Sequence, residues 1–209
     1  MLLFAVHISD GYLHPLALGT GFSIAVVLVA ISTWKLHEDE IPRIGVMTAA
    51  FFVASLIHLP LGITSAHLLL NGLMGVVLGI RAAIAIAVGL FLQAFLFQHG
   101  GLTTLGVNIA IYAIPAMLTG FTFRPVRRLK WLPDFALGCV FGALTATLTV
   151  VLNYIVLLTA GQEDWRTLAN LVFVAHLPII AVEAIGVGFT VQYLGKVKPE
   201  WVGGSEIIR

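Results

Sequence analysis

Charge is the scarcest property of this 209-residue sequence, since only 10% of its residues are Asp, Glu, Lys or Arg. A soluble domain carries roughly 25% charged residues to cover its water-facing surface. Because 59% of the chain is hydrophobic, the composition excludes an ordinary soluble domain and indicates an integral membrane protein. The net charge of +1 argues neither for nor against binding of nucleic acid. No basic patch interleaved with aromatic residues is present, so we expect no nucleic-acid partner.

Cysteine and the common catalytic motifs are nearly absent as well. The one cysteine, Cys139, lies in an apolar run and cannot form an internal disulfide. The sequence contains no HExxH, GxSxG or Walker A motif, and no GxGxxG between a strand and a helix. These absences predict a protein that is not an enzyme. Residues 1–6 are apolar but lack the charged start and the length of a signal peptide.

Seven apolar stretches follow one another along the chain. They cover about residues 15–33, 44–59, 66–80, 82–98, 104–121, 134–160 and 167–195. The first, sixth and seventh are long enough to span a bilayer, whereas the middle ones fall near or below the ~20 residues of a spanning helix. No linker or internal repeat divides the chain. The sequence therefore predicts a single all-α transmembrane domain over residues 1–209, a compact bundle of about seven transmembrane helices.

The basic residues fall almost entirely at one set of alternate ends of these stretches. Ten of the eleven would lie on one side of a seven-span alternation: Lys35, Arg43, Arg81, Arg124, Arg127, Arg128, Lys130, Lys196, Lys198 and Arg209. Only Arg166, beside Glu163 and Asp164, lies on the other side. By the positive-inside rule, we expect the N-terminus outside the cell and the tail 196–209 in the cytoplasm.

Histidines are the chemically distinctive residues. Of the seven, only His37 lies in the first cytoplasmic loop, and the other six map to the outer half: His7, His14, His58, His67, His99 and His176. Imidazole is the usual protein ligand of nickel, copper and zinc. A histidine at a helix end more often packs or caps than binds metal, and one ion needs about four donors. Most of the six are therefore expected to be structural or to support the metal ligands.

Glu183 is the one acidic residue deep in an apolar stretch. It follows His176 by seven residues, or two helical turns, so the two side chains can face the same way. A carboxylate within a membrane needs a partner. A hydrogen bond between helices is the favoured interpretation, and an acid that supports a metal ligand is the alternative.

Two other functions would also use histidines in a membrane. A redox protein with histidine-ligated haem needs histidine pairs that face each other within the bilayer, yet only His176 lies deep. An intramembrane zinc hydrolase could combine His176 and Glu183 with a third ligand. No His-x-x-x-His or paired acidic motif supports the hydrolase.

Several segments, in one order along nearly the whole chain, carry a resemblance to a known family. They are His7-Ile8-Ser9-Asp10-Gly11-Tyr12-Leu13, Ile41-Pro42-Arg43, Ala49-Ala50-Phe51-Phe52, the stretches 64–72, 89–94 and 99–108, and Ala175-His176-Leu177-Pro178 with Glu183. The sequence resembles the CbiM/NikM family, the substrate-capture membrane subunits of energy-coupling-factor transporters for cobalt and nickel.

The resemblance implies an ATP-driven importer subunit in a prokaryotic cell membrane that captures Co²⁺ or Ni²⁺ outside and has no cofactor of its own. Its partners would be a transmembrane T subunit, cytoplasmic ATPase subunits and a small accessory membrane subunit. One expected context is cobalamin biosynthesis. The sequence does not distinguish cobalt from nickel, because both metals use the same nitrogen donors.

The resemblance also implies a metal site at the N-terminus. The segment 1–14 would fold back into the bundle, and His7 and His67 would bind the ion together with the α-amine and an amide nitrogen. Four such nitrogens suit Ni(II) and accommodate Co(II). The candidates for supporting or alternative ligands are Asp10, His14, His58, Asn71, His99, His176 and Glu183.

The start of the chain departs from the family pattern, in which the sequence begins Met-His. Here six residues precede His7, so the α-amine of Met1 cannot share chelate rings with this imidazole. We expect translation to begin at Val6, because a GTG codon would initiate with methionine and give Met-His-Ile-Ser-Asp-Gly. Proteolytic trimming and a rearranged site are the alternatives.

Overall fold

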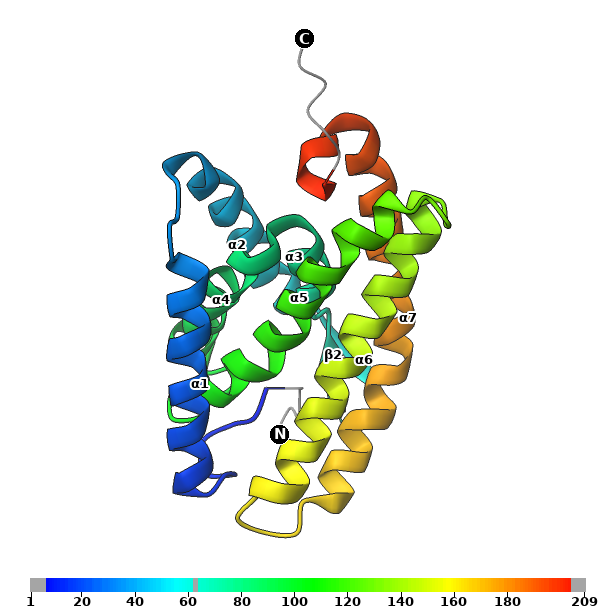
Figure 1. Cartoon of the computed structure of the whole chain (residues 1–209). Helices are drawn as coiled ribbons and strands as arrows, with labels where there is room; N and C mark the ends of the chain where they lie inside the picture. The colour runs from blue at the N-terminus through cyan, green and yellow to red at the C-terminus, as the bar shows by residue number, and fades with distance from the viewer. Residues whose placement is uncertain (1–6, 62–63, 204–209) are drawn as a thin grey trace.

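Helices form most of the structure, a computed structural model that describes residues 7–61 and 64–203 (Figure 1). The α-helices are α1 (Pro15–Thr33), α2 (Ile41–Ser55), α3 (Asn71–Leu78), α4 (Ala82–Phe97), α5 (Leu105–Arg128), α6 (Asp134–Ala160) and α7 (Arg166–Val197). Short 3-10 helices are η1 (Glu38–Glu40), η2 (Gly79–Arg81) and η3 (Pro199–Val202), and the strands are β1 (His58–Leu61) and β2 (Thr64–His67). The helical class predicted from the sequence is confirmed, with one small hairpin added to it.

The segment 66–80 is not the helix that the sequence predicted. Strands β1 and β2 pair antiparallel, with His58 opposite His67, and α3 begins only at Asn71. Pro60 lacks a backbone N–H, and a proline disfavours helix at the residue before it. The chain therefore leaves the helical conformation after α2 and satisfies its backbone groups by pairing across the hairpin. His58 consequently lies in β1 rather than at a helix end, and His67 ends β2 rather than opening a span.

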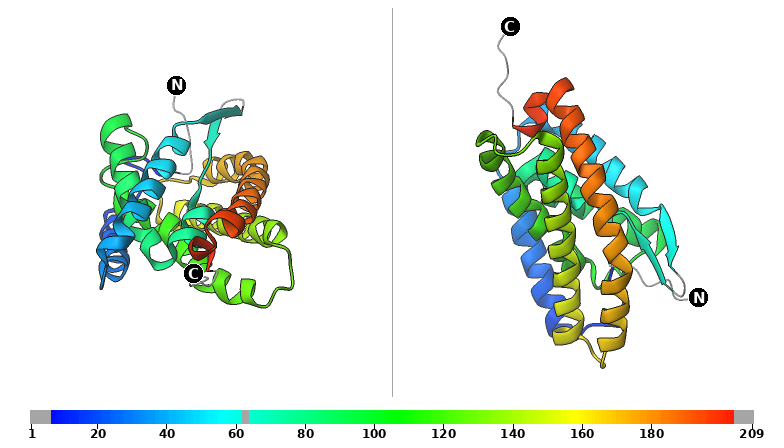
Figure 2. Two further views of the ribbon diagram at one scale, coloured as in Figure 1. Left: turned by 90° about the horizontal axis from the view of Figure 1, so that it is seen from above. Right: turned by 90° about the vertical axis from the view of Figure 1, so that its right-hand side faces the viewer.

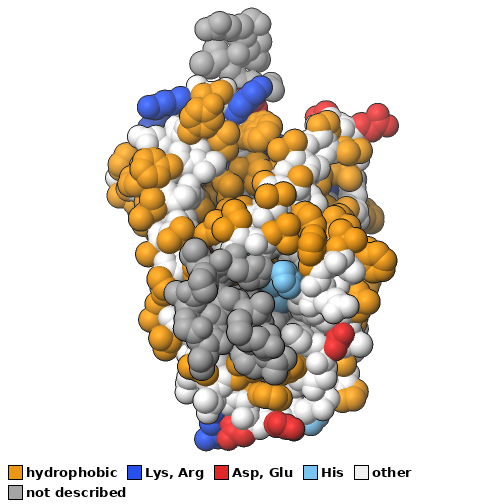
Figure 3. Space-filling view, turned by 180° about the vertical axis from the view of Figure 1, so that it is seen from behind, with side chains coloured by type: hydrophobic (Ala, Val, Ile, Leu, Met, Phe, Trp, Pro, Cys, Tyr) orange, Lys and Arg blue, Asp and Glu red, His pale blue; other side chains and the backbone are white. Residues whose placement is uncertain are grey.

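Within the described residues, five helical stretches are long and apolar enough to cross a membrane. They are Pro15–Thr33, Asn71–Phe97, Leu105–Arg128, Asp134–Ala160 and Arg166–Val197, and the second comprises α3, η2 and α4. Hydrophobic side chains cover much of the face in Figure 3, while Lys and Arg lie toward its two ends. The chain is therefore a multi-pass membrane protein. Helix α2, with 15 residues, is shorter than a usual span, so the count of seven spans stays a prediction.

Glycines allow the closest approaches between helices. Helices α6 and α7 lie side by side along their length (Figures 1 and 2), and a Cβ added to Gly142 would lie 3.0 Å from the carbonyl oxygen of Glu183. Helix α5 meets the α3–η2 stretch in the same way, since a Cβ on Gly120 would lie 2.4 Å from the Cα of Gly79. Such contacts between small residues are a usual basis of helix packing in lipid.

Arg81 joins several segments at the end of the bundle that carries most of the basic residues. Its guanidinium donates hydrogen bonds to both carboxylate oxygens of Glu40, at 3.1 and 2.9 Å. It also donates to the carbonyl oxygens of Ser32, Trp34 and Lys35, at 2.7–2.9 Å. All five donors of one buried arginine are thereby satisfied, and the α1–α2 connection is fixed against η2.

Candidate metal centre

The segment after His7 enters the bundle and is held by α5. The Ile8 N–H donates to Oδ1 of Asn108, and Nδ2 of Asn108 donates to the Ile8 carbonyl, each at 3.0 Å. The hydroxyl of Thr104 donates to the same carbonyl at 2.6 Å. Ile8, Thr104 and Asn108 are all buried. Polar side chains thus satisfy backbone groups that would be costly to bury alone, and this part of the predicted N-terminal segment lies inside the protein.

Asp10 ties the same segment to the loop before α5. Its carboxylate accepts the Thr103 N–H at 2.9 Å and also the hydroxyl of Thr103. Gly101 must be a glycine here, because a Cβ would lie 1.9 Å from Oδ1 of Asp10. Asp10 was predicted to support or replace a metal ligand, and in the structure its carboxylate holds this loop.

The end of the segment is attached to the loop between α6 and α7. Leu13 forms an isolated antiparallel bridge with Gly161. The His14 N–H donates to the Ala160 carbonyl at 2.9 Å, and Nε2 of Gln162 donates to the Leu13 carbonyl at 2.8 Å. Residues 8–14 are therefore fixed at both ends, by α5 and by the α6–α7 loop. His14 itself is exposed.

The two histidines predicted to bind metal lie against each other. The ring centroids of His7 and His67 are 4.8 Å apart with the planes 12° from parallel. On its other side His7 stacks on Tyr112, at 5.0 Å and 8°. His7, His67 and Tyr112 are 6%, 1% and 0% exposed. The two imidazoles are thus close neighbours in a buried place, and an ion shared by them would lie about 2 Å from one nitrogen of each ring.

A carboxylate from α7 fixes the backbone just after His67. Oε1 of Glu183 accepts the N–H groups of Leu69 and Leu70, at 2.6 and 2.9 Å. Leu70 has a left-handed backbone, with φ of 48°, which costs energy for a residue with a Cβ. The two hydrogen bonds offset this cost, so Glu183 takes part in setting where His67 lies. The sequence favoured a hydrogen bond from Glu183 to another helix. In the structure Glu183 instead accepts hydrogen bonds from the segment that joins β2 and α3.

The hydrogen bond of His67 determines which ring nitrogen can bind a metal. Its Nδ1 lies 2.9 Å from the carbonyl oxygen of Leu68. A carbonyl can only accept, so Nδ1 carries a proton, and in the neutral ring the lone pair is then on Nε2. A neutral imidazole oriented by a backbone carbonyl is the usual arrangement of a metal-binding histidine.

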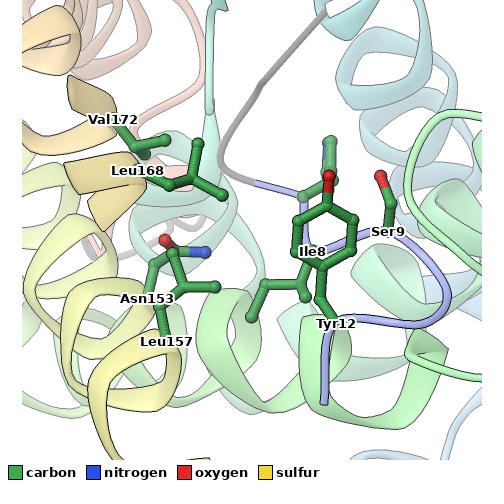
Figure 4. Close-up of a pocket in the computed structure, with 8 residues that line it drawn as sticks. Ile8, Ser9, Tyr12, Asn153, Leu157, Leu168 and Val172 are labelled. Atoms are coloured by element: carbon green, nitrogen blue, oxygen red, sulfur yellow. The ribbon is translucent and has the colours of Figure 1, made fainter. Parts of the chain in front are cut away.

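A small cavity of about 20 Å³ lies beside His7. In Figure 4, Ile8, Ser9 and Tyr12 of the N-terminal segment lie on one side of it, and Asn153, Leu157, Leu168 and Val172 of α6 and α7 lie on the other. This volume is about that of one water molecule. The surroundings of His7 are thus closely packed but not completely filled.

The remaining predicted residues lie at several different places. His99 follows α4 in the turn that reaches Gly100, whose added Cβ would lie 3.3 Å from the Cβ of His7. His176 is buried and donates from Nδ1 to the Val172 carbonyl at 2.7 Å, within its own helix. Asn71 is buried at the start of α3, where its amide donates to the Tyr112 carbonyl at 3.3 Å and to Thr149 at 2.5 Å. His58 pairs through its backbone with His67.

Three residues of α5 and its N-terminal end contribute to the site although the sequence did not single them out. Thr104 and Asn108 hold Ile8, and Tyr112 stacks on His7. Positions 104, 108 and 112 are spaced by four, which places them on one helical face. A line of polar side chains on one face of an apolar helix is the signal that could have identified them.

At the candidate site the described residues place two imidazoles together, those of His7 and His67, but not a full set of side-chain ligands. Within residues 7–61 and 64–203, no group of three or more His, Cys, Asp or Glu side chains could hold a metal ion. Further donors would have to come from the backbone or from the chain before His7. The predicted α-amine and the expected start at Val6 lie outside the described residues.

The overall shape is that of solved metal transporters. One structure described as a transition metal transporter aligns with a TM-score of 0.79 and 24% identity, over 91% of this chain and 93% of that one. A truncated transition metal transporter aligns with a TM-score of 0.75 and 22% identity, over 90% and 97%. Because neither identity exceeds 24%, this likeness establishes the fold alone.

Curated relatives have names that describe metal transport. A protein of Haemophilus influenzae, named as a metal transport protein, is 34% identical over 96% of this chain and 98% of its own length. The cobalt transport protein CbiM of Sorangium cellulosum is 26% identical over 98% and 97%. A fused nickel transport protein, NikMN of Rhodobacter capsulatus, is 36% identical over 52% of this chain and 33% of its own.

A family model covers nearly the whole described chain. It is the model for the cobalt uptake substrate-specific transmembrane region, and it matches residues 7–201. Its match begins at His7 and extends to Trp201 in η3. This protein therefore belongs to the CbiM family of membrane proteins for cobalt uptake.

Proposed function

We propose that this protein is the substrate-capture subunit of a cobalt or nickel importer and that His7 and His67 bind the ion. The observation that carries the proposal is the proximity of these two buried imidazoles, whose ring centroids are 4.8 Å apart. Imidazole nitrogens suit Ni²⁺ and Co²⁺. The family membership and the names of the relatives, which include cobalt and nickel transport proteins, support a divalent metal as the substrate.

The remaining donors are proposed to be the α-amine and a backbone amide nitrogen near His7. The hydrogen bonds from Thr104 and Asn108 to Ile8 hold the segment that would present them. Binding through an amide nitrogen displaces its proton, so we expect metal capture to weaken as the pH falls. Asp10 and Glu183 would act on the positions of the ligands rather than bind the ion.

We further propose that His7 and His67 face the outside of the cell. Arg43, Arg81, Arg124 and Arg128 line one cavity at the opposite end, and Arg127 contacts Asp134 and the Val202 carbonyl nearby. Basic residues that gather at one end are typical of the cytoplasmic side. This distribution agrees with an N-terminus outside the cell and a C-terminus in the cytoplasm. It also agrees with seven membrane-crossing helices, if the short α2 and α3 are counted among them.

The energy that releases the metal ion into the cell is proposed to come from partner subunits. The sequence has no Walker A motif for ATP binding, so a transmembrane T subunit and cytoplasmic ATPase subunits would supply it. A small accessory membrane subunit would complete the transporter. The location that fits such an assembly is the cell membrane of a prokaryote.

Isothermal titration of the purified protein with NiCl₂ and with CoCl₂ tests the proposal. Replacing either histidine (His7→Ala or His67→Ala) should lower metal affinity on the order of a hundredfold or more, because each removes one of about four donors. His37→Ala is the matched control, since His37 precedes η1 at the other end, and it should bind as the wild type does. Unchanged affinity in His67→Ala, with the protein shown to be folded, would refute the proposed site.

A further inference from the structure

A larger cavity, of about 430 Å³, lies at the end of the bundle opposite to the histidines. Four arginines, Arg43, Arg81, Arg124 and Arg128, line it together with one carboxylate, Glu40. They come from α2, η2 and α5, which are distant in the sequence. The cavity therefore has an excess of positive charge that the metal-binding function does not use.

Glu40 already accepts hydrogen bonds from one of these arginines, Arg81. Both of its carboxylate oxygens accept hydrogen bonds from Arg81, whereas its distance to the nearest nitrogen of Arg43 is 4.0 Å. Arg81 in turn donates to three carbonyl oxygens and to Glu40. Among the described residues that line the cavity, Arg43, Arg124 and Arg128 consequently have no strong anionic partner.

Two of these three arginines bury a donor that the wall does not satisfy. The Nε atoms of Arg43 and Arg124 are buried, and neither has a hydrogen-bond partner among residues 7–61 and 64–203. A buried, unsatisfied donor on a charged group is costly. A phosphate, with several oxygens and a negative charge, is the kind of acceptor that guanidinium groups such as these pair with.

The rest of the cavity surroundings is largely apolar and exposed. Phe121 lines the cavity and is 57% exposed, and Leu118, one turn earlier on α5, is 49% exposed. Trp34 and Trp131, in the α1–α2 and α5–α6 connections, are 73% and 79% exposed. Exposed tryptophans of this kind are typical of the level of the lipid headgroups. The arginines thus lie directly beside a surface that suits acyl chains.

We propose that this cavity binds the phosphate of an anionic phospholipid. Arg43, Arg124 and Arg128 hold the phosphate, and the acyl chains lie along the exposed face of α5 at Phe121 and Leu118. The apolar face distinguishes a lipid from free inorganic phosphate, which would not use it. It also argues against an acidic protein segment, because the arginines are beside exposed apolar side chains that such a segment would not match.

Native mass spectrometry of the detergent-purified protein tests the proposal with defined lipids. Dioleoyl phosphatidylglycerol should bind more tightly than dioleoyl phosphatidylcholine, and inorganic phosphate at millimolar concentration should not displace it. The double variant Arg124→Gln/Arg128→Gln should bind phosphatidylglycerol about 25-fold more weakly, or about fivefold for each arginine. The matched control Lys130→Gln removes a charge from the same end but outside the cavity lining, and its affinity should equal that of the wild type.

The outcomes separate the possible occupants. Equal binding of the two lipids, or an unchanged affinity in the double variant, would overturn the proposal. Displacement by inorganic phosphate would assign the site to the free anion and would equally overturn it. Nickel titration of the double variant should match the wild type, since the metal ligands lie at the other end. The lipid result therefore does not depend on the proposed metal function.

Discussion

Asn108 of α5 and Ile8 of the N-terminal segment exchange a pair of hydrogen bonds, N–H to Oδ1 and Nδ2–H to carbonyl, each 3.0 Å long. The asparagine amide thus pairs with the chain as a neighbouring strand would. Both residues are buried, and Ile8 directly follows His7. The position of a proposed metal ligand therefore depends on a side chain one hundred residues further along the sequence.

Replacing Asn108 with alanine should weaken metal binding without removing a ligand. Two buried hydrogen bonds are lost, each with a net contribution of about 0.5–1.5 kcal/mol. We expect nickel affinity to fall roughly tenfold and the melting temperature to fall as well, measured by titration and by thermal unfolding. The control Tyr154→Phe removes an exposed hydrogen bond to Asn170 and should change neither. Wild-type nickel affinity in Asn108→Ala would show that Asn108 does not position His7.

Hydropathy was sufficient to predict the long helices. The predicted stretches 15–33 and 134–160 coincide with α1 and α6, because most of their residues are apolar and long apolar runs have few alternatives in lipid. It was not sufficient around His58 and His67. A short apolar run does not distinguish a strand from a helix, and here Pro60 and the pairing with β2 decided the conformation.

The sequence predicted two candidate ligands but not the residues that hold them in place. His7 and His67 were predicted from the family resemblance, and the structure places their rings close together, while metal binding by them stays a prediction. The roles of Asn108 and Glu183 depend on contacts across 100 and 114 residues of sequence. Each of these side chains satisfies backbone N–H groups, which every segment of the chain possesses, so the sequence alone does not indicate which segment they reach.

Cysteine labelling should determine the orientation of the bundle. In a background with Cys139→Ala, a cysteine at Glu163 lies in the α6–α7 loop and one at Lys196 lies near the end of α7, and both positions are exposed. We expect an impermeant thiol reagent added to whole cells to label Glu163→Cys but not Lys196→Cys, because basic residues gather on the cytoplasmic side of membrane proteins. Permeabilised cells provide the control, since both should then react. The reverse pattern would place His7 and His67 on the cytoplasmic side.

The contact between α3–η2 and α5 should tolerate no side chain at Gly120. A Cβ there would lie 2.4 Å from the Cα of Gly79, so Gly120→Ala must push two helical segments apart. We expect a destabilisation of about 1–3 kcal/mol, observed as a lower midpoint of thermal unfolding in detergent. Gly186→Ala in α7 is the matched control, because nothing lies within 4 Å of its added Cβ. Equal melting of the two variants would contradict this packing.

The ion pair at the basic end should make stability depend on pH. The hydrogen bonds from Arg81, together with the N–H of His37 and against a smaller effect of burial, lower the pKa of Glu40 below its ordinary value of 4.5. A lowered pKa means that the carboxylate stabilises the fold fully above pH 4.5, and that this contribution is lost as the pH falls through the lower, folded-state value. The advantage of the wild type over Glu40→Gln in thermal unfolding should therefore be constant near neutral pH and should shrink in acid.

The control for that measurement is another acidic residue at the same end. Glu200 is 3.8 Å from Lys198 in an exposed pair, and such pairs contribute little. The melting temperature of Glu200→Gln should equal that of the wild type at every pH in the same range. A difference between wild type and Glu40→Gln that stays constant through acid would mean that the Glu40 carboxylate is not what stabilises the α1–α2 connection.

Glu183 should act by holding the backbone after His67, and two substitutions can separate this role from metal ligation. Glu183→Gln keeps a carbonyl oxygen that can accept the N–H groups of Leu69 and Leu70, whereas Glu183→Ala leaves both buried without an acceptor. An unsatisfied buried donor costs about 1–3 kcal/mol. We therefore expect Glu183→Ala to melt lower and bind nickel weakly, and Glu183→Gln to retain most of both properties. If Glu183 were a ligand, the loss of its charge in Glu183→Gln would reduce nickel affinity as strongly as His67→Ala does. Titration of these three variants beside the wild type distinguishes the two roles, because only a positioning role lets the amide replace the carboxylate.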